Sequence, residues 1–172
     1  MKRIAEFIPA CRSLDASEFA RRYPHHVLVH SSLTGQLRPL DQTRGITIDR
    51  LVVGEGEAPQ PDASSLADYF TVFVIEGRDP KGTVSVGISS ACDIQVNDAS
   101  NSKVHAHFAM INGAMCVRDN ESTSGTHLNG EMIGSDKWYP TDAGDRVTLG
   151  MVELVLLSPT EFHAFVRRMF RM

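Results

Sequence analysis

The fold is decided by residues 84–150, which read VSVGISSACDIQVNDASNSKVHAHFAMINGAMCVRDNESTSGTHLNGEMIGSDKWYPTDAGDRVTLG. Two pairs, Asn112-Gly113 and Asn129-Gly130, divide this segment, and Asn-Gly is the preferred pair for a two-residue hairpin turn. Short apolar and β-branched runs flank these pairs and a third turn at Gly150. The runs are residues 105–111, 114–119, 126–128, 131–133, 146–149 and 152–157. No stretch of helical periodicity separates them, so the segment predicts an antiparallel β-sandwich or barrel.

The strand pattern continues toward the N-terminus. Residues 69–76 (YFTVFVIE) are aromatic and β-branched, residues 77–82 have turn chemistry, and short strands are expected at 83–86 and 93–96. Farther upstream, residues 26–30 and 45–53 are further strand candidates. Between them and the sandwich, residues 54–65 (GEGEAPQPDASS) are rich in Gly, Pro, Ser and acid, which predicts an exposed linker or long loop.

Helices are expected only near the two ends. Residues 13–23 can form a short helix that is capped by Ser13 or Asp15 and stopped by Pro24. At the other end Ser158 can cap a helix over residues 160–170, in which apolar residues recur at helical spacing. The sequence therefore predicts three parts. They are an N-terminal extension (1–66) with a short helix, strands and a linker, a sandwich (67–158), and a C-terminal amphipathic helix (159–172).

Composition narrows the class of protein. The 172 residues carry a formal charge of −4, which argues against nucleic acid as a partner because such binding needs a basic face. No apolar run is long enough for a membrane span and no signal peptide opens the chain, so a cytoplasmic location is expected. Cys11, Cys92 and Cys116 are far apart, which predicts free thiols rather than a disulfide framework or a zinc site.

The segment also resembles the forkhead-associated (FHA) domain. The resemblance rests on an ordered series of motifs, none of which is specific alone. Val86-Gly87 precedes a short loop, and Ser102-Lys103-Val104-His105-Ala106 is similar to the family's S-R/K-x-H-A. Further on, residues 122–126 (STSGT) are similar to its S-x-N-G-T, residues 128–130 (LNG) to its final N-G, and residues 144–150 (GDRVTLG) to its closing G-D-x-I-x-L-G. The motifs span roughly half of the chain.

The resemblance implies a site for phosphothreonine at the loop end of the sandwich. Such a site needs hydroxyl and amide donors and a cation facing a phosphate of about −1.5 to −2 charge. The residues implied in phosphopeptide binding are Ser102, Lys103, Thr123, Ser124 and Asn129. The residues implied in the structure of the motif are Gly87, His105, Gly125, Thr126, Gly130 and Asp145. Two positions depart from the family: Ile88 replaces an arginine that binds the phosphate, and Ser124 replaces an asparagine.

Two functions lead from the sequence, beside an enzyme or regulator whose active part lies in the first half of the chain and a small component of a larger secretion or signalling assembly. The first is an FHA-type protein–protein interaction module that recognises a partner segment phosphorylated on threonine by a Ser/Thr kinase. The second is a scaffold or self-association module that kept the FHA fold and lost phosphate binding. No nucleophile elbow, nucleotide loop or dinucleotide fingerprint is present, so no enzymatic activity and no cofactor are expected. His105 and His107 share a strand but lack an evident third ligand, so no metal site is expected.

Overall fold

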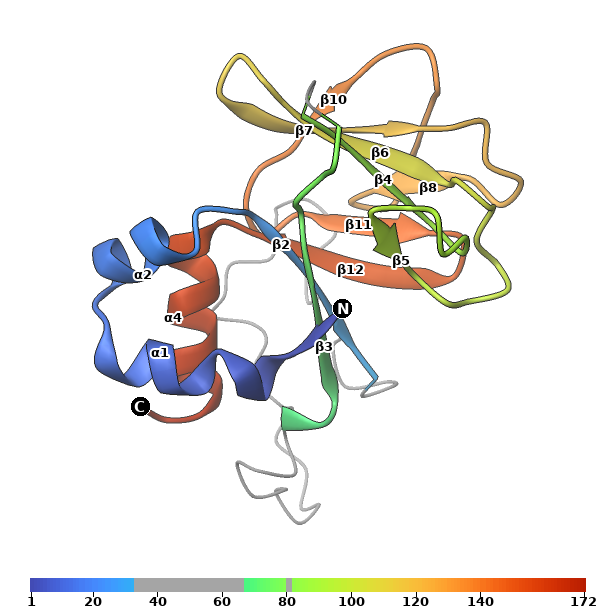
Figure 1. Cartoon of the computed structure of the whole chain (residues 1–172). Helices are drawn as coiled ribbons and strands as arrows, with labels where there is room; N and C mark the ends of the chain where they lie inside the picture. The colour runs from blue at the N-terminus through green and yellow to red at the C-terminus, as the bar shows by residue number, and fades with distance from the viewer. Residues whose placement is uncertain (33–66, 80–81) are drawn as a thin grey trace.

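The computed structural model describes residues 1–32, 67–79 and 82–172, and in these it is mainly β (Figure 1). Two sheets face each other. In spatial order, the first consists of β1 (Lys2–Arg3), β3 (Phe70–Val74), β2 (Val27–Ser31), β12 (Val152–Leu157), β11 (Arg146–Leu149), β8 (Thr126–Leu128) and β9 (Glu131–Ile133). The second consists of β10 (Tyr139–Pro140), β7 (Ala114–Asp119), β6 (Ala106–Ile111), β4 (Thr83–Gly87) and β5 (Ile94–Gln95). The prediction of a mainly β sandwich with short terminal helices is confirmed.

The pairing of the described strands is antiparallel with one exception. β4 and β5 run parallel, with Val86 opposite Ile94, because the loop of residues 88–93 returns the chain to the same edge in the same direction. Both Asn-Gly turns form as expected. Asn112 and Gly113 have φ values of 51° and 81°, and the same left-handed pair recurs in the turn between β8 and β9. The facing sides of the two sheets close over a core to which each contributes, as with Phe108 and Leu154.

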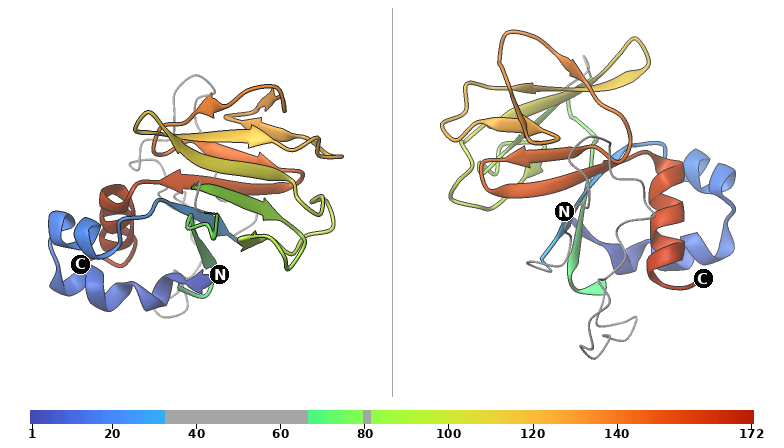
Figure 2. Two further views of the ribbon diagram at one scale, coloured as in Figure 1. Left: turned by 45° about the horizontal axis from the view of Figure 1, so that its top comes forward. Right: turned by 180° about the vertical axis from the view of Figure 1, so that it is seen from behind.

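A second apolar core lies on the outer side of the seven-stranded sheet. There α1 (Ile8–Ser13), α2 (Ala16–Arg22) and α4 (Pro159–Met169) pack on β2, β3 and β12. Figure 2 shows these helices gathered on one side of the molecule, away from β6 and β7. In β12 the residues alternate between the two cores: Leu154 and Leu156 face the sandwich, whereas Val155 and Leu157 face the helices. At β2, β3 and β12 the sheet is therefore buried on both faces, as the nearly continuous apolar sequence of these strands indicates.

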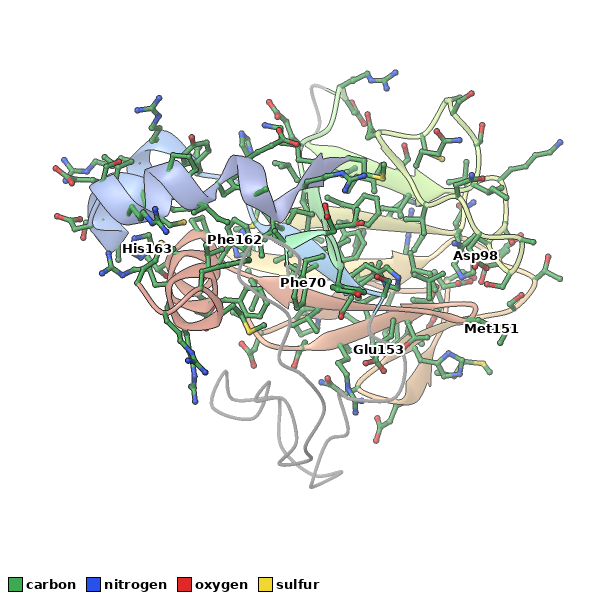
Figure 3. All side chains as sticks on the ribbon, turned by 90° about the horizontal axis from the view of Figure 1, so that it is seen from below. Phe70, Asp98, Met151, Glu153, Phe162 and His163 are labelled. Carbon is green, nitrogen blue, oxygen red and sulfur yellow. The ribbon has the colours of Figure 1, made fainter. Side chains whose placement is uncertain are left out.

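The helix termini follow capping chemistry. Asp15 caps α2 by accepting hydrogen bonds from the backbone N–H groups of Ser17 and Glu18, so this helix begins after Asp15 rather than at Ser13. Ser158 caps α4 together with Glu161, as the sequence predicts. In Figure 3, Phe162 and His163 lie between α4 and the N-terminal helices, and His163 Nε2 is 3.0 Å from the carbonyl of Leu14.

The predicted division at residue 66 does not coincide with a division of the sheet. β2, from the predicted N-terminal extension, lies between β3 and β12, and Val29 is opposite both Val72 and Val155. Tertiary pairing, which the local sequence does not specify, places this strand inside the sandwich. The strand candidate at 45–53 and the linker at 54–65 lie outside the described residues. Within the described part of the chain, no helix is long and apolar enough to cross a bilayer.

Candidate functional site

Three loops converge at the end of the sandwich that lies away from the helices. They join β4 to β5 (88–93), β5 to β6 (96–105) and β7 to β8 (120–125). In Figure 3, Asp98 of the second loop lies near Met151 on this side of the molecule. The first two loops are tied by hydrogen bonds that the backbone N–H groups of Ile88 and Ser89 donate to the carbonyls of Ser102 and Lys103, at 3.0 and 3.1 Å.

Gly87 makes this close approach of the first two loops possible. A Cβ atom at this position would collide with the carbonyl groups of Ser102 and Lys103. Any side chain here would push the second loop away from β4 and break the two backbone hydrogen bonds. Gly87 therefore lets the loop that carries Ser102 and Lys103 lie directly on the end of β4.

His105 joins the second loop to the third. Its side chain is fully buried, and the backbone N–H of Ser102 donates a hydrogen bond to its Nδ1 at 3.1 Å. Because Nδ1 accepts, a neutral ring carries its proton on Nε2 and donates to the carbonyl of Gly125, also at 3.1 Å. The imidazole thus holds two loops that are 20 residues apart in the sequence at a fixed separation.

We expect His105→Ala to lower the free energy of unfolding by about 1–3 kcal/mol, because the Ser102 N–H loses its acceptor and the Gly125 carbonyl keeps only its hydrogen bond from the Gly150 N–H. Urea denaturation followed by circular dichroism measures this loss. His25→Ala is the matched control, since His25 is exposed, and we expect it to change the free energy by less than about 0.5 kcal/mol. Equal stability of the two variants would contradict the bracing role.

Asp119 fixes the shape of the third loop. Its carboxylate accepts hydrogen bonds from the hydroxyls of Ser122 and Thr126, both at 2.6 Å, and from the backbone N–H of Ser122 at 2.9 Å. Burial works to raise the pKa of Asp119, but these hydrogen bonds outweigh it, so the pKa lies below its ordinary value. Thr126 is itself fully buried, so its hydroxyl binds the Asp119 carboxylate from the interior of the protein.

Ser102 and Thr123 meet at the loop surface although 21 residues separate them. The Thr123 N–H donates to Ser102 Oγ at 3.0 Å, and the two hydroxyl oxygens are 3.5 Å apart. Lys103, which follows Ser102, is exposed. The structure thus brings together two hydroxyls and places an ammonium on the adjacent residue, which is the donor set that a phosphate group requires.

Two of the remaining positions have internal partners. The hydroxyl of Ser124, which stands where the family has asparagine, donates to the carbonyl of Ser100 at 2.8 Å and so ties the third loop to the second. Ile88 is half-buried at the end of β4, beside the carbonyl of Ser102. The three loops together contain one lysine and three acidic residues, Asp93, Asp98 and Glu121, so the cationic contribution of Lys103 is not supported by a second basic residue within them.

Asn129 lies at the opposite end of β8 from these loops. Its side chain donates to Asp145 Oδ1 at 2.8 Å and accepts from the backbone N–H of Arg146 at 2.9 Å. It therefore joins the β8–β9 turn, which includes Gly130, to the turn before β11. Asp145 also accepts from the Asp142 N–H at 2.8 Å, so it stabilises both turns. The structure does not bring Asn129 together with Ser102 and Thr123.

Two arginines lie near the loop end on other elements. Arg78 contacts the first loop: its Nη2 is 3.5 Å from the carbonyl of Cys92 and its Nε is 3.8 Å from the carboxylate of Asp93. Arg118, on β7, has its guanidinium carbon 4.7 Å from the centre of the Trp138 ring. Of the two, Arg78 makes contact with a loop of the site.

The comparisons with known proteins agree with this architecture. Residues 77–150 match the sequence model of the FHA domain. A curated relative, the ABC transporter ATP-binding/permease protein Rv1747 of Mycobacterium tuberculosis, is 31% identical over 98 residues, which are 57% of this chain and 11% of the relative. The residues that match the FHA domain run from the loop between β3 and β4 to the turn after β11, so the match covers the part of the sandwich that carries the three loops. The chain spans about a tenth of the length of this curated relative.

Solved structures of FHA domains are also similar to this chain. The FHA domain of CT664 from Chlamydia trachomatis is 18% identical, with a TM-score of 0.46, over 77% of this chain and 97% of that one. The Mycobacterium tuberculosis Rv1747 FHA-1 structure is 22% identical, with a TM-score of 0.41, over 52% and 86%. An FHA domain studied for phosphothreonine-dependent interactions is 14% identical, with a TM-score of 0.46, over 77% and 95%.

Proposed function

We propose that the loop end of this FHA domain binds a segment of a partner protein through a phosphothreonine. The observation that carries the proposal is the meeting of Ser102 and Thr123, whose hydroxyl oxygens are 3.5 Å apart at the surface, next to the exposed Lys103. The two hydroxyls would donate to phosphate oxygens, and the lysine would supply the charge. Ser102, Lys103 and Thr123 are the residues to which we assign this contact, with Ser124 and Asn129 acting through the loops and turns that they tie.

The rigidity of the loops supports this assignment. Gly87, His105 and Asp119 hold the three loops through backbone and buried side-chain hydrogen bonds, so the donors are positioned before a ligand arrives. A site that is ordered in advance spends less free energy on ordering side chains when it binds. The carboxylates of Asp93, Asp98 and Asp119 each accept from a nearby hydroxyl and hold the loops in shape, and we therefore assign the domain to recognition rather than catalysis. We also assign it to the cytoplasm, where a Ser/Thr kinase would phosphorylate its partner.

The test is a titration of the full chain with a degenerate phosphothreonine peptide library and its unphosphorylated twin. We expect binding of the phosphorylated library only. Ser102→Ala and Lys103→Ala should each weaken it by about tenfold or more, because each removes a hydrogen bond to a charged group. Arg21→Ala is the matched control for the lysine, since Arg21 is an exposed cation on α2, among the helices on the far side of the molecule.

A second candidate function rests on a specific observation. Ile88 places an apolar side chain where the family has a phosphate-binding arginine, and the hydroxyl of Ser124 is engaged by Ser100. A lost hydrogen bond to a charged group costs roughly 1.5–3 kcal/mol, so phosphate binding without compensation would be weak. The alternative is a scaffold that binds its partner independently of phosphorylation. Equal binding of both peptide libraries, or of neither, would favour this second function.

A further inference from the structure

A pocket of about 250 Å³ is lined by residues of α2, α4, β2 and β3, and none of the three loops contributes to it. The helices α2 and α4 lie on the side of the molecule away from those loops (Figure 1). The floor of the pocket is apolar and consists of side chains from the second core: Phe7, Phe19, Val27 and Phe162. Tyr23 adds a fourth ring, and Phe7 packs edge-on against both Tyr23 and Phe162, with ring centres 5.6 and 5.0 Å apart. For comparison, a cavity of about 150 Å³ lined by such residues holds a benzene molecule.

The rim of the pocket is basic, although the chain as a whole carries a charge of −4. Lys2 Nζ lies 5.6 Å from the centre of the Phe7 ring, and the guanidinium carbon of Arg22 lies 5.9 Å from that of Tyr23. The rim also holds His25 and Glu76, which are 3.8 Å apart. Among the described residues, no carboxylate lies within ion-pair distance of Lys2 or Arg22. Two cations thus stand over aromatic rings at the mouth, and neither has an acidic partner in the part of the chain that the structure describes.

We propose that this pocket is a second binding site, for an aromatic side chain that is flanked by Asp or Glu in a segment of a partner protein. The ring would lie against the rings that line the pocket, where edge-to-face contacts are favourable, and displace water from the mouth. The flanking carboxylates would pair with Lys2 and Arg22 at the mouth. None of the residues of the phosphate site lines the pocket, so this contact requires no phosphorylation.

The proposal also gives the helices a function beyond packing. The pocket exists because α2, α4 and the segment before α1 close over the ends of β2 and β3, which a bare sandwich would leave open. A partner that engages both the pocket and the loop end would bind through two linked contacts, and linkage raises the overall affinity without new contacts at either site. The two sites can be tested separately because they share no residue.

The probe is a pool of acetylated pentapeptides with Asp or Glu at the four outer positions and Phe, Tyr or Trp at the centre. It is titrated into the isotopically labelled full chain and followed by the backbone amide resonances of Phe19, Tyr23 and Val74, which line the pocket. We expect these resonances to shift at up to millimolar peptide. We also expect no shift with a pool that has Ala at the centre, and weaker binding with one that has Asn and Gln outside. A phosphothreonine peptide should not compete.

Two double variants with the same net charge distinguish the effect of the cations at the pocket from the effect of the protein's overall charge. Lys2→Glu with Arg22→Glu reverses both rim cations, and we expect about a tenfold loss of affinity for the acidic pool. Arg12→Glu with Arg21→Glu makes the same change of net charge at exposed helix positions outside the pocket, and we expect less than about a twofold change. The proposal is overturned if no pocket resonance shifts, if the Ala pool binds equally, or if the two double variants lose the same affinity.

Discussion

Replacing Phe162 with Ala is expected to lower the free energy of unfolding by about 3–5 kcal/mol, the range for truncating a fully buried phenylalanine. Phe162 is 1% exposed and its ring lies 5.0 Å from that of Phe7 and 6.2 Å from that of Phe19. It thus joins α4 to both the segment before α1 and α2. The cavity left behind would open toward the pocket, so the rings around it would lose partners rather than collapse inward.

Urea denaturation of the full chain measures this change, and a second probe shows where it acts. Hydrogen exchange should report earlier opening of α1, α2 and α4 than of β6 and β7, because the two cores are distinct. Met110→Ala is the control, since Met110 is 53% exposed and should cost less than about 0.5 kcal/mol. A loss for Phe162→Ala no larger than that of this control would show that the helices contribute little to the stability of the sandwich.

Ile88→Arg is expected to strengthen binding of a phosphothreonine peptide by about ten- to hundredfold. The backbone N–H of Ile88 donates a hydrogen bond to the carbonyl of Ser102, so the side chain at this position begins next to the loop that carries Ser102 and Lys103. An arginine adds a planar fork of donors, and one charge-assisted hydrogen bond is worth roughly 1.5–3 kcal/mol. Because the site is at the surface, the gain should decrease as salt is added.

The matched control is Ile88→Met, which lengthens the side chain without adding charge and should leave the affinity within about twofold of the original. The gain of Ile88→Arg should disappear when Lys103 or Ser102 is also changed to Ala. Tight binding by the unmodified chain would instead show that another cation replaces the missing arginine. Arg78→Ala is then the first variant to measure, since this arginine already contacts the first loop at Cys92. If neither form distinguishes the phosphorylated peptide, the chain acts as a phosphorylation-independent scaffold.

Much of the sandwich follows from local chemistry. Asn112-Gly113 and Asn129-Gly130 adopt the left-handed conformations that a two-residue hairpin needs, and the strands beside them begin and end where the apolar runs do. The sequence does not indicate the edge strands β1 and β10, one in each sheet, because each is two residues long and too short for any periodicity to appear.

The candidate site was only partly predictable. The motif order implies Ser102, Lys103 and Thr123 as one group, and the structure brings Ser102 and Thr123 into contact, with the exposed Lys103 next to Ser102 in the chain. Asn129 follows Thr123 closely in the sequence, yet β8 carries it to the far end of the sheet, where Asp145 and Arg146 hold its side chain. Ser124 remains beside the group, but its hydroxyl turns to Ser100. Residues that are only a few positions apart in the sequence can therefore lie at opposite ends of a strand, and the motif alone does not show this.

The sequence by itself determines the short strands, the left-handed turns and the residue types at the loop end, because turns, capping and strand periodicity depend on neighbours a few residues away. The position of β2 between β3 and β12 is decided only in the tertiary structure, since nothing local distinguishes one apolar strand from another as a pairing partner. The same holds for the helices over the seven-stranded sheet. Their apolar faces could cover any apolar surface, and they cover this one because β2, β3 and β12 are apolar on both sides.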